Sequence, residues 1–294
     1  MISKIKIKWT PSNIFLTANR QPPTANRHPY ICNMDISVKG KNAVICGSSQ
    51  GIGLAAAKEL AMNGANCILM ARDPKALEQA IVQLPGQGDQ HHQWVAADFS
   101  DPGLVGHHIG NIVRENRIEI LVNNTGGPKA GNILDAPAEA FELAFRQHLI
   151  CNQILARAVV PGMREAGYGR IVNIISTSVK TPLANLGVSN TIRLAVASWA
   201  KTLANEIGQY NITVNNILPG LTNTQRLTEL IKHTAASVKK DSEIIEAQMK
   251  ESIPMKRFGT PEEIANMIAF LASPAASYVN GVNIAVDGGR TPAF

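Results

Sequence analysis

Short apolar segments alternate with longer amphipathic segments along the chain after residue 33. The short segments are mostly apolar throughout, as expected of parallel strands that are covered on both faces. We expect strands at Asn42–Cys46, Asn66–Met70, Gln93–Ala97, Glu119–Asn123, Ile171–Ile175, Thr213–Ile217 and Asn283–Val286. Helical patterns fill the intervals, for example at Leu54–Met62, Ala138–Glu165 and Val188–Ile207. This repetition predicts an α/β fold, a single doubly wound domain with a seven-stranded parallel sheet and helices on both faces.

The first 33 residues differ from the rest in composition. They contain four prolines and repeat Thr-Ala-Asn-Arg at 17–20 and 24–27. A basic, acid-free arm of this kind is open to a targeting role, but it lacks the apolar core of a secretory signal, and its prolines oppose an amphipathic transit helix. The favoured interpretation is a disordered N-terminal extension over 1–33, followed by one domain over 34–294.

Charge narrows the class of partner. The 294 residues carry 28 Lys+Arg against 22 Asp+Glu, a formal net charge of +6. Five of these bases and no acids lie in residues 1–33, so the predicted domain is nearly neutral. Without a basic stripe we expect no nucleic-acid partner, and without a run of 18 apolar residues we expect no membrane-spanning helix. A small-molecule substrate is the expected partner.

Cysteine usage predicts the redox compartment. The four cysteines, Cys32, Cys46, Cys67 and Cys151, form no CxxC pair and have no metal-like spacing to histidine. We therefore expect a reduced, cytoplasmic protein with neither a disulfide framework nor a metal site.

The first expected strand runs into a glycine-rich turn, Gly47-Ser48-Ser49-Gln50-Gly51-Ile52-Gly53, which precedes an expected helix. Glycines at these positions allow a tight turn, close approach of a pyrophosphate, and close packing of helix on strand, while the helix N-terminus favours the anion. Alone the motif is weak, because glycine-rich strand-to-helix turns are common.

Further motifs follow in a recognisable order. They are Asp98 after the third strand, Asn123-Asn124-Thr125-Gly126 after the fourth, Gly169-Arg170-Ile171-Val172-Asn173 before Ser176, then Pro219-Gly220, Arg257–Glu263 and Val286–Gly289. With the glycine turn, they make residues 34–294 resemble the short-chain dehydrogenase/reductases, which are Rossmann-type oxidoreductases. The β-ketoacyl carrier-protein reductase-like members are the most similar in these motifs. The resemblance implies a homodimer or homotetramer built through the helices at 138–165 and 188–207.

The resemblance also implies a nicotinamide-cofactor site. The pyrophosphate would lie at the turn, Asp98 and Phe99 at the adenine, Asn124 near a ribose, and Thr222 near the nicotinamide. The full implied set is Gly47, Ser49, Gln50, Gly51, Ile52, Gly53, Arg72, Asp98, Phe99, Asn124, Gly126, Arg193, Pro219, Gly220 and Thr222.

Arg72 favours one cofactor over the other. It follows the second expected strand, where an acid would accept hydrogen bonds from the 2′-hydroxyl of NAD. A guanidinium instead suits the 2′-phosphate of NADP through a bidentate contact. NADP is therefore expected rather than NAD, although Asp73 follows directly and a solvated surface charge is the alternative for Arg72.

The catalytic positions depart from the family pattern. Typical members use Asn, Ser, Tyr and Lys, and the Tyr donates a proton to the substrate carbonyl. Here Ser176 matches the Ser, Ser189 stands at the Tyr position, Arg193 at the Lys position and His148 at the Asn position. No tyrosine of the chain aligns with the missing one.

The replacements still permit chemistry. Ser189 and Arg193 are four residues apart on one expected helix, so they share a face. An alkanol is a much weaker acid than an activated phenol, and general acid catalysis contributes about 10²–10⁴ in rate. His148 is the one residue in this region whose side chain ordinarily titrates near neutrality, so it could relay a proton, but a packed or surface histidine is the favoured interpretation. The leading hypothesis has Ser176 orient the substrate oxygen, Arg193 hold the cofactor, and Ser189 or His148 handle the proton.

Two other functions stay open at this point. One is a degenerate nucleotide-binding or regulatory module, and the other is a reductase with different proton chemistry, such as reduction of an activated double bond. The expected main reaction is hydride transfer to or from a carbonyl or alcohol, with a 3-oxoacyl-like substrate among the candidates. The resemblance also implies a substrate lid over residues 224–253. Apolar positions recur there at helical spacing, which fits either a cover over the substrate or ordinary packing against the domain.

Overall fold

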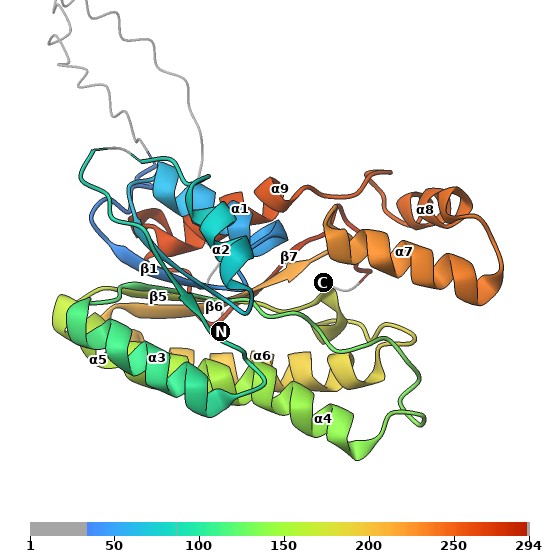
Figure 1. Cartoon of the computed structure of the whole chain (residues 1–294), viewed down its shortest axis with the longest axis horizontal. Coiled ribbons are helices and arrows are strands. Elements are labelled where there is room, and N and C mark those ends of the chain that lie inside the picture. The colour runs from blue at the N-terminus through green and yellow to red at the C-terminus, as the bar shows by residue number, and fades with distance from the viewer. Residues whose placement is uncertain (1–33, 87, 293–294) are drawn as a thin grey trace, which may run out of the picture. The chain divides into compact units, whose positions relative to one another are not determined.

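The computed structural model confirms the predicted parallel sheet (Figure 1). It describes residues 34–86 and 88–292, so the extension expected over 1–33 lies outside the described residues. The strands are β1 (Asn42–Cys46), β2 (Asn66–Ala71), β3 (Gln93–Ala96), β4 (Ile120–Asn123), β5 (Gly169–Ile174), β6 (Ile212–Pro219) and β7 (Asn283–Val286). Their order is β3-β2-β1-β4-β5-β6-β7, and each neighbouring pair is parallel. The doubly wound topology expected from the sequence is therefore confirmed.

Helices cover both faces of this sheet (Figure 1). One layer contains α1 (Gly51–Met62), α2 (Pro74–Ile81) and α9 (Pro261–Ala272). The other contains α3 (Pro102–Glu115), α5 (Cys151–Ala166) and α6 (Gly187–Ile207). Single 3₁₀ turns complete the connections at η2 (Thr177–Val179), η3 (Gly208–Tyr210) and η4 (Pro274–Ala276). With two apolar faces to cover, each central strand is buried along its length, which explains its uniform hydrophobicity.

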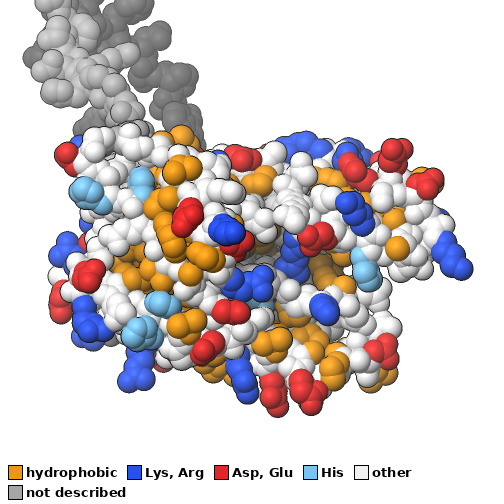
Figure 2. Space-filling model, viewed as in Figure 1, with side chains coloured by type: hydrophobic (Ala, Val, Ile, Leu, Met, Phe, Trp, Pro, Cys, Tyr) orange, Lys and Arg blue, Asp and Glu red, His pale blue; other side chains and the backbone are white. Residues whose placement is uncertain are grey.

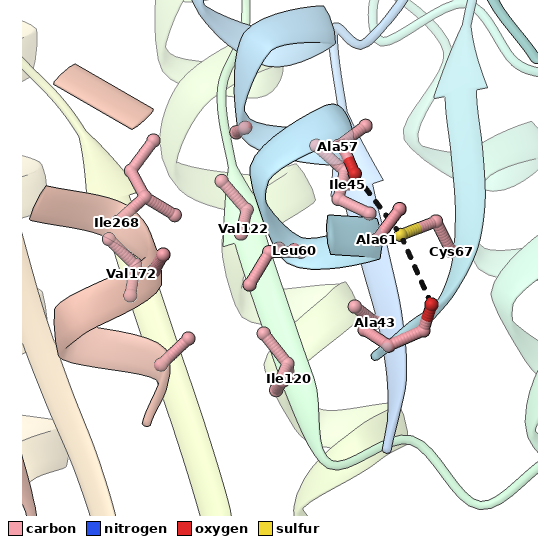
Figure 3. Packing of buried hydrophobic residues seen from close by; sticks show 14 of the residues in the cluster. Ala43, Ile45, Ala57, Leu60, Ala61, Cys67, Ile120, Val122, Val172 and Ile268 are labelled. Atoms are coloured by element: carbon pink, nitrogen blue, oxygen red, sulfur yellow. Dashed lines mark hydrogen bonds between the residues drawn. The ribbon is translucent and has the colours of Figure 1, made fainter. Parts of the chain in front are cut away.

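Small side chains bring α1 close to the sheet. Ala57, Leu60 and Ala61 are fully buried and pack over β1 and β4, next to Ile268 of α9 (Figure 3). Cys67 of β2 joins this cluster, and its Sγ lies 3.5 Å from the carbonyl oxygen of Ala57. Burial raises the pKa of the Cys67 thiol to about 12, so it is a packing residue rather than a nucleophile.

A row of asparagines pins the register of the other half of the sheet. The Nδ2 of Asn123 donates to Oδ1 of Asn173, Asn173 donates to Asn216, and Asn216 donates to Asn283, each at 2.8 Å. These residues lie opposite one another on β4, β5, β6 and β7. The ladder satisfies most of the polar groups that these side chains bring into an apolar sheet.

Helix starts follow local sequence signals. The side chain of Asp101 caps α3, and Thr260 and Glu263 form a capping box at α9. In both helices proline occupies a first-turn position, where a missing N–H costs nothing.

The long helix expected over Ala138–Glu165 is interrupted. It consists of α4 (Ala138–Phe145), a π-helical turn η1 (Arg146–Ile150), and α5. A π turn accommodates one additional residue per turn and changes which side chains face inward. The inward-facing residue of this turn is His148, which is 1% exposed.

The expected lid at 224–253 folds as two helices, α7 (Gln225–Val238) and α8 (Ser242–Glu251), beyond the edge of the sheet (Figure 1). Leu227, Ile231 and Ile245 form a small core between them, while Ile244 is exposed. In the described part of the chain, no helix is both long enough and apolar enough to span a membrane.

Candidate active site

The site lies where the strand order reverses, between the carboxyl ends of β1 and β4. Open α/β sheets bind ligands at this point. The first part of the site along the chain is the glycine turn. Gly47 and Gly51 have φ of +59° and +57°, a region that favours glycine. A Cβ on Gly47 would meet the backbone oxygen of Asn124, and a Cβ on Gly53 would meet that of Gly47. The sequence thus requires glycine here for close backbone packing.

The N-terminus of α1 suits an anion. Gln50 stands at the N-cap without a side-chain hydrogen bond. Ser49 precedes it in the turn, and Ile52 lies in the first turn of the helix. First-turn N–H groups that lack a capping side chain remain available for phosphate oxygens, and the helix dipole favours negative charge. The residues present therefore fit the diphosphate of a dinucleotide.

Asn124 supports the turn from β4. Its Nδ2 donates to the backbone oxygens of Cys46, at 3.3 Å, and Gly47, at 3.2 Å. The structure therefore directs this amide beneath the glycine turn, while its expected role near a ribose stays a prediction. Gly126, two residues on, has open space where a Cβ would stand.

The expected adenine end is partly built from core residues. Phe99 is 6% exposed and packs with Cys151 and Ile109 in the α3–α5 layer. Asp98 accepts a hydrogen bond from the backbone N–H of Ser100 at 2.8 Å, and this bond is the main cause that holds the pKa of Asp98 below its usual value. Asp98 is therefore the ionised group at this end of the site.

Arg72 and Asp73 have different roles. The carboxylate of Asp73 accepts from the backbone N–H groups of Lys75 and Ala76 and caps α2. Arg72 is exposed at the end of β2, and the described residues include no salt bridge to it. Asp73, which made the cofactor preference ambiguous in the sequence, is thus engaged in capping α2, and the guanidinium of Arg72 is available to bind a ligand.

Pro219 ends β6, and the following turn packs tightly. A Cβ on Gly220 would stand 2.6 Å from Cα of Asp287. The Thr222 hydroxyl donates to the backbone oxygen of Gly220 at 3.2 Å. Thr224 lies nearer the glycine turn, since its Cγ2 would be 3.3 Å from a Cβ on Gly51. Sequence reasoning named Thr222 and missed Thr224.

His148 is buried at the π turn and pairs with Thr125. The Thr125 Oγ1 and His148 Nδ1 are 2.5 Å apart. Burial, followed by the charges of Arg193 and Arg226, lowers the pKa of His148 to about 2. His148 therefore does not titrate near neutrality, because the ring is desolvated beside two cations and stays neutral.

Arg193 is hydrogen-bonded to backbone oxygens of the protein itself. Its guanidinium donates to the backbone oxygen of Ile174 at 3.0 Å and to that of Thr125 at 3.3 Å. Burial, and then the charge of Arg226, lowers its pKa to about 9. Arg193 thereby ties α6 to the ends of β5 and β4, next to His148.

The two serines offer hydroxyls with different surroundings. Ser176 is partly exposed and accepts a hydrogen bond from the backbone N–H of Ser178 at 3.1 Å, which leaves its own O–H free to donate. Ser189, 7% exposed, lies in the first turn of α6, one turn before Arg193. The structure brings Arg193, His148 and Thr125 together, while the joint action of Ser176 and Ser189 on a substrate stays a prediction.

Arg226, in the first turn of α7, also belongs to this region. A Cβ built on Gly127 would lie 2.9 Å from Cζ of Arg226. Its guanidinium therefore rests against the loop that follows β4. Sequence analysis named Thr125 only within the Asn123–Gly126 motif and Arg226 only within the expected lid. It assigned neither side chain a role, because their contacts join segments far apart in the chain.

Comparisons with known proteins agree with this architecture. A family model described as enoyl-(acyl carrier protein) reductase matches residues 47–291. The uncharacterized oxidoreductase YvrD of Bacillus subtilis is 33% identical over 260 residues, which cover 87% of this chain and 98% of that protein. Dehydrogenase/reductase SDR family member 4 of Sus scrofa is 31% identical over 264 residues, covering 86% and 88%.

A solved structure is similar as well. L-sorbose reductase from Gluconobacter frateurii, described as complexed with NADPH and L-sorbose, has a TM-score of 0.83 and 35% identity, covering 88% of this chain and 100% of that one. A fold and a glycine turn of this kind define a Rossmann-type oxidoreductase. The chain belongs to the short-chain dehydrogenase/reductase family, as the sequence motifs predicted.

Proposed function

We propose that this protein is an NADP-dependent oxidoreductase that transfers hydride to or from a carbonyl or alcohol. NADPH supplies the hydride when it is bound. The observation that carries the proposal is the glycine turn, in which Gly47 and Gly53 leave no room for a Cβ beside the uncapped start of α1. Such a turn is built for the diphosphate of a dinucleotide.

Arg72 supports NADP over NAD. It is exposed at the end of β2, while the neighbouring Asp73 is engaged at the start of α2. A guanidinium recognises a 2′-phosphate with two parallel hydrogen bonds. The similar L-sorbose reductase, described with NADPH, is consistent with this preference.

Proton handling rests on hydroxyls in this proposal. The free O–H of Ser176 orients the substrate oxygen, and Ser189 donates the proton in place of the family tyrosine. The neutral His148 holds the Thr125 hydroxyl in place and, with it, serves as a relay rather than as an ionised acid. Since a serine is a poor acid, we expect a slow chemical step, or a substrate whose reduced form needs little acid assistance.

The direct test is a fluorescence titration of the purified chain with NADPH and NADH. It is followed by a screen of 3-oxoacyl esters, ketoses and activated enones for loss of NADPH absorbance. Tight NADPH binding with turnover supports the proposal. Binding without turnover on every substrate favours a nucleotide-binding module, and no binding of either cofactor would overturn the assignment.

Two variants sharpen this test. Arg72→Gln should weaken NADPH binding by about tenfold to a hundredfold, since it removes charge-assisted hydrogen bonds, and leave NADH unchanged. The double change Ser189→Tyr, Arg193→Lys restores the family pattern. A sharp rise in carbonyl reduction would identify an impaired reductase, whereas loss of an existing activity would identify a separate mechanism.

A homodimer or homotetramer is part of the proposal. Leu143 and Phe145 of α4 and Leu194 of α6 are 46%, 40% and 54% exposed, and together they give these helices an apolar outer surface suited to a second copy. Light scattering after gel filtration tests it, and a monomer at micromolar concentration would contradict it. A cytoplasmic location stays a prediction from the cysteine content.

A further inference from the structure

One guanidinium in the candidate active site has no anionic partner. Arg226 lies against Gly127, and among the described residues no carboxylate comes within ion-pair distance of it. The nearest acid that influences it, Glu229, is on the same helix and accepts a hydrogen bond from Gln225 at 3.1 Å. The hydrogen-bond donors of Arg226 are therefore free to bind a ligand.

The surroundings of Arg226 are cationic, and its own side chain is exposed to solvent at the start of α7. Its positive charge contributes to the lowered pKa values of both Arg193 and His148. Arg193 is hydrogen-bonded to carbonyl oxygens, which do not neutralise it. Figure 2 shows Lys and Arg side chains in the hollow between α7 and the layer of α4 and α6. An uncompensated positive charge in such a place attracts an anion.

A second polar group in the same place also lacks a partner. The Nε2 of His148 is buried and has no hydrogen-bond partner within residues 34–86 and 88–292. The other ring nitrogen is held by Thr125. The charge of Arg226, on α7, acts on the buried ring of His148 at the π turn, while Arg226 itself is the group that a ligand can reach.

We propose that Arg226 binds an anionic oxygen group, a phosphate or a carboxylate, of the ligand that enters the candidate active site. The inference rests on the proposed function and extends it to a residue of the lid. A planar guanidinium recognises both groups with two parallel hydrogen bonds. The phosphate would come from the cofactor, since Thr224 and Arg226 start the helix that faces the glycine turn. The carboxylate would come from an oxoacid substrate beside Arg193 and His148.

The source can be separated by matched probes. The cofactor arm measures binding of NADPH, reduced nicotinamide mononucleotide and 2′,5′-ADP. The substrate arm compares KM for acetoacetate with KM for methyl acetoacetate, which lacks the charge. A third arm needs no cofactor and titrates malonate and inorganic phosphate by calorimetry, so it still reports if the chain fails to bind NADPH.

Arg226→Gln is the test variant and Lys232→Gln the control, because Lys232 is exposed on the same helix and carries the same charge. Arg226→Gln should weaken binding of the probe whose anionic group Arg226 contacts, by about tenfold to a hundredfold. This is the loss expected when charge-assisted hydrogen bonds are removed. Arg226→Lys should keep part of the affinity.

The outcomes are distinct. Weaker binding of NADPH and of reduced nicotinamide mononucleotide, with 2′,5′-ADP unchanged, assigns Arg226 to the cofactor phosphate. A raised KM for acetoacetate alone assigns it to a substrate carboxylate. If Arg226→Gln and Lys232→Gln are indistinguishable in all three arms, the proposal is overturned, whereas loss of NADPH binding in the unaltered protein overturns only the proposed function.

Discussion

The glycine turn and the catalytic end of the site are built on different principles. At the turn, backbone contacts determine the residues, since Gly47 and Gly53 cannot carry a Cβ. At the catalytic end, side chains cooperate, with Thr125 holding His148 and Arg193 holding the oxygens of Ile174 and Thr125. The glycine turn accepts few other residues, because any Cβ would clash with the backbone. A group of side chains can be replaced by other side chains as long as their hydrogen bonds are satisfied.

That difference explains how a chain can keep its family's nucleotide loop and depart from the family's catalytic residues. Close backbone contacts determine the residues of the glycine turn, so these residues are recognisable in the sequence. The catalytic end is set by hydrogen bonds of buried side chains. The hydroxyl of Thr125 pairs with His148, and its backbone oxygen accepts from Arg193.

The largest expected effect would break the turn. Gly53→Val places side-chain atoms against the backbone oxygen of Gly47 and should cost about 3 kcal/mol of unfolding free energy, together with NADPH binding. Urea denaturation and fluorescence titration measure the two effects. Gly110→Ala on α3 is the control, because a Cβ there meets nothing within 4 Å, and equal losses in both variants would refute the steric argument.

The next effect would break the catalytic end. Arg193→Leu leaves two backbone oxygens in a buried region without their donors and should cost about 1–3 kcal/mol for each one that stays unsatisfied. Calorimetric unfolding measures the loss. Arg157→Leu, on an exposed site of α5, is the control and should change stability by less than about 0.5 kcal/mol. An equally small effect at Arg193 would show that the guanidinium is dispensable for the fold.

A smaller effect isolates one hydrogen bond. Thr125→Val keeps the shape of the side chain but leaves Nδ1 of His148 buried and unpaired, at a cost of about 1–2 kcal/mol in urea denaturation. Thr202→Val removes a hydroxyl that bonds Ser198 on the exposed side of α6 and should have little effect. If Thr125→Val is silent, the threonine does not hold the ring.

The smallest effect is a pH dependence. His148 has its pKa lowered from 6.5 to about 2, so below pH 6.5 the unfolded chain takes up a proton that the folded chain does not. Stability should therefore fall with decreasing pH below about 6.5, by on the order of 1 kcal/mol per pH unit, and receive no contribution from this group above that value.

His148→Asn should flatten that slope in denaturation curves between pH 6.5 and 5. His107→Asn, which alters an exposed histidine on α3, should keep the slope of the unaltered protein. Identical slopes in all three proteins would mean that His148 is protonated in the folded state.

The sequence predicts the frame of this molecule well and its side-chain contacts poorly. Strand positions follow from burial on both faces, which leaves mostly apolar runs such as those of β1 and β4. Helix caps at Asp73, Asp101 and Thr260 are local signals as well.

Three features of the site could not be predicted. The π turn at Arg146–Ile150 inserts a residue into a continuous helical pattern without a compositional mark. The contact of Arg226 with Gly127 joins parts of the chain about a hundred residues apart. The neutrality of His148 depends on burial beside Arg193, which only the folded arrangement provides.

The asparagine ladder has a consequence for how the sheet assembles. A strand that pairs one residue out of register turns its asparagine to the opposite face. For β5 or β6 such a slip removes two amide bonds at once, because Asn173 and Asn216 each connect two neighbours. An intermediate with such a strand out of register therefore lacks two hydrogen bonds. Correct alignment of one strand places its asparagine where the next strand can pair with it. The four asparagines therefore favour the native register of β4, β5, β6 and β7 while the sheet forms.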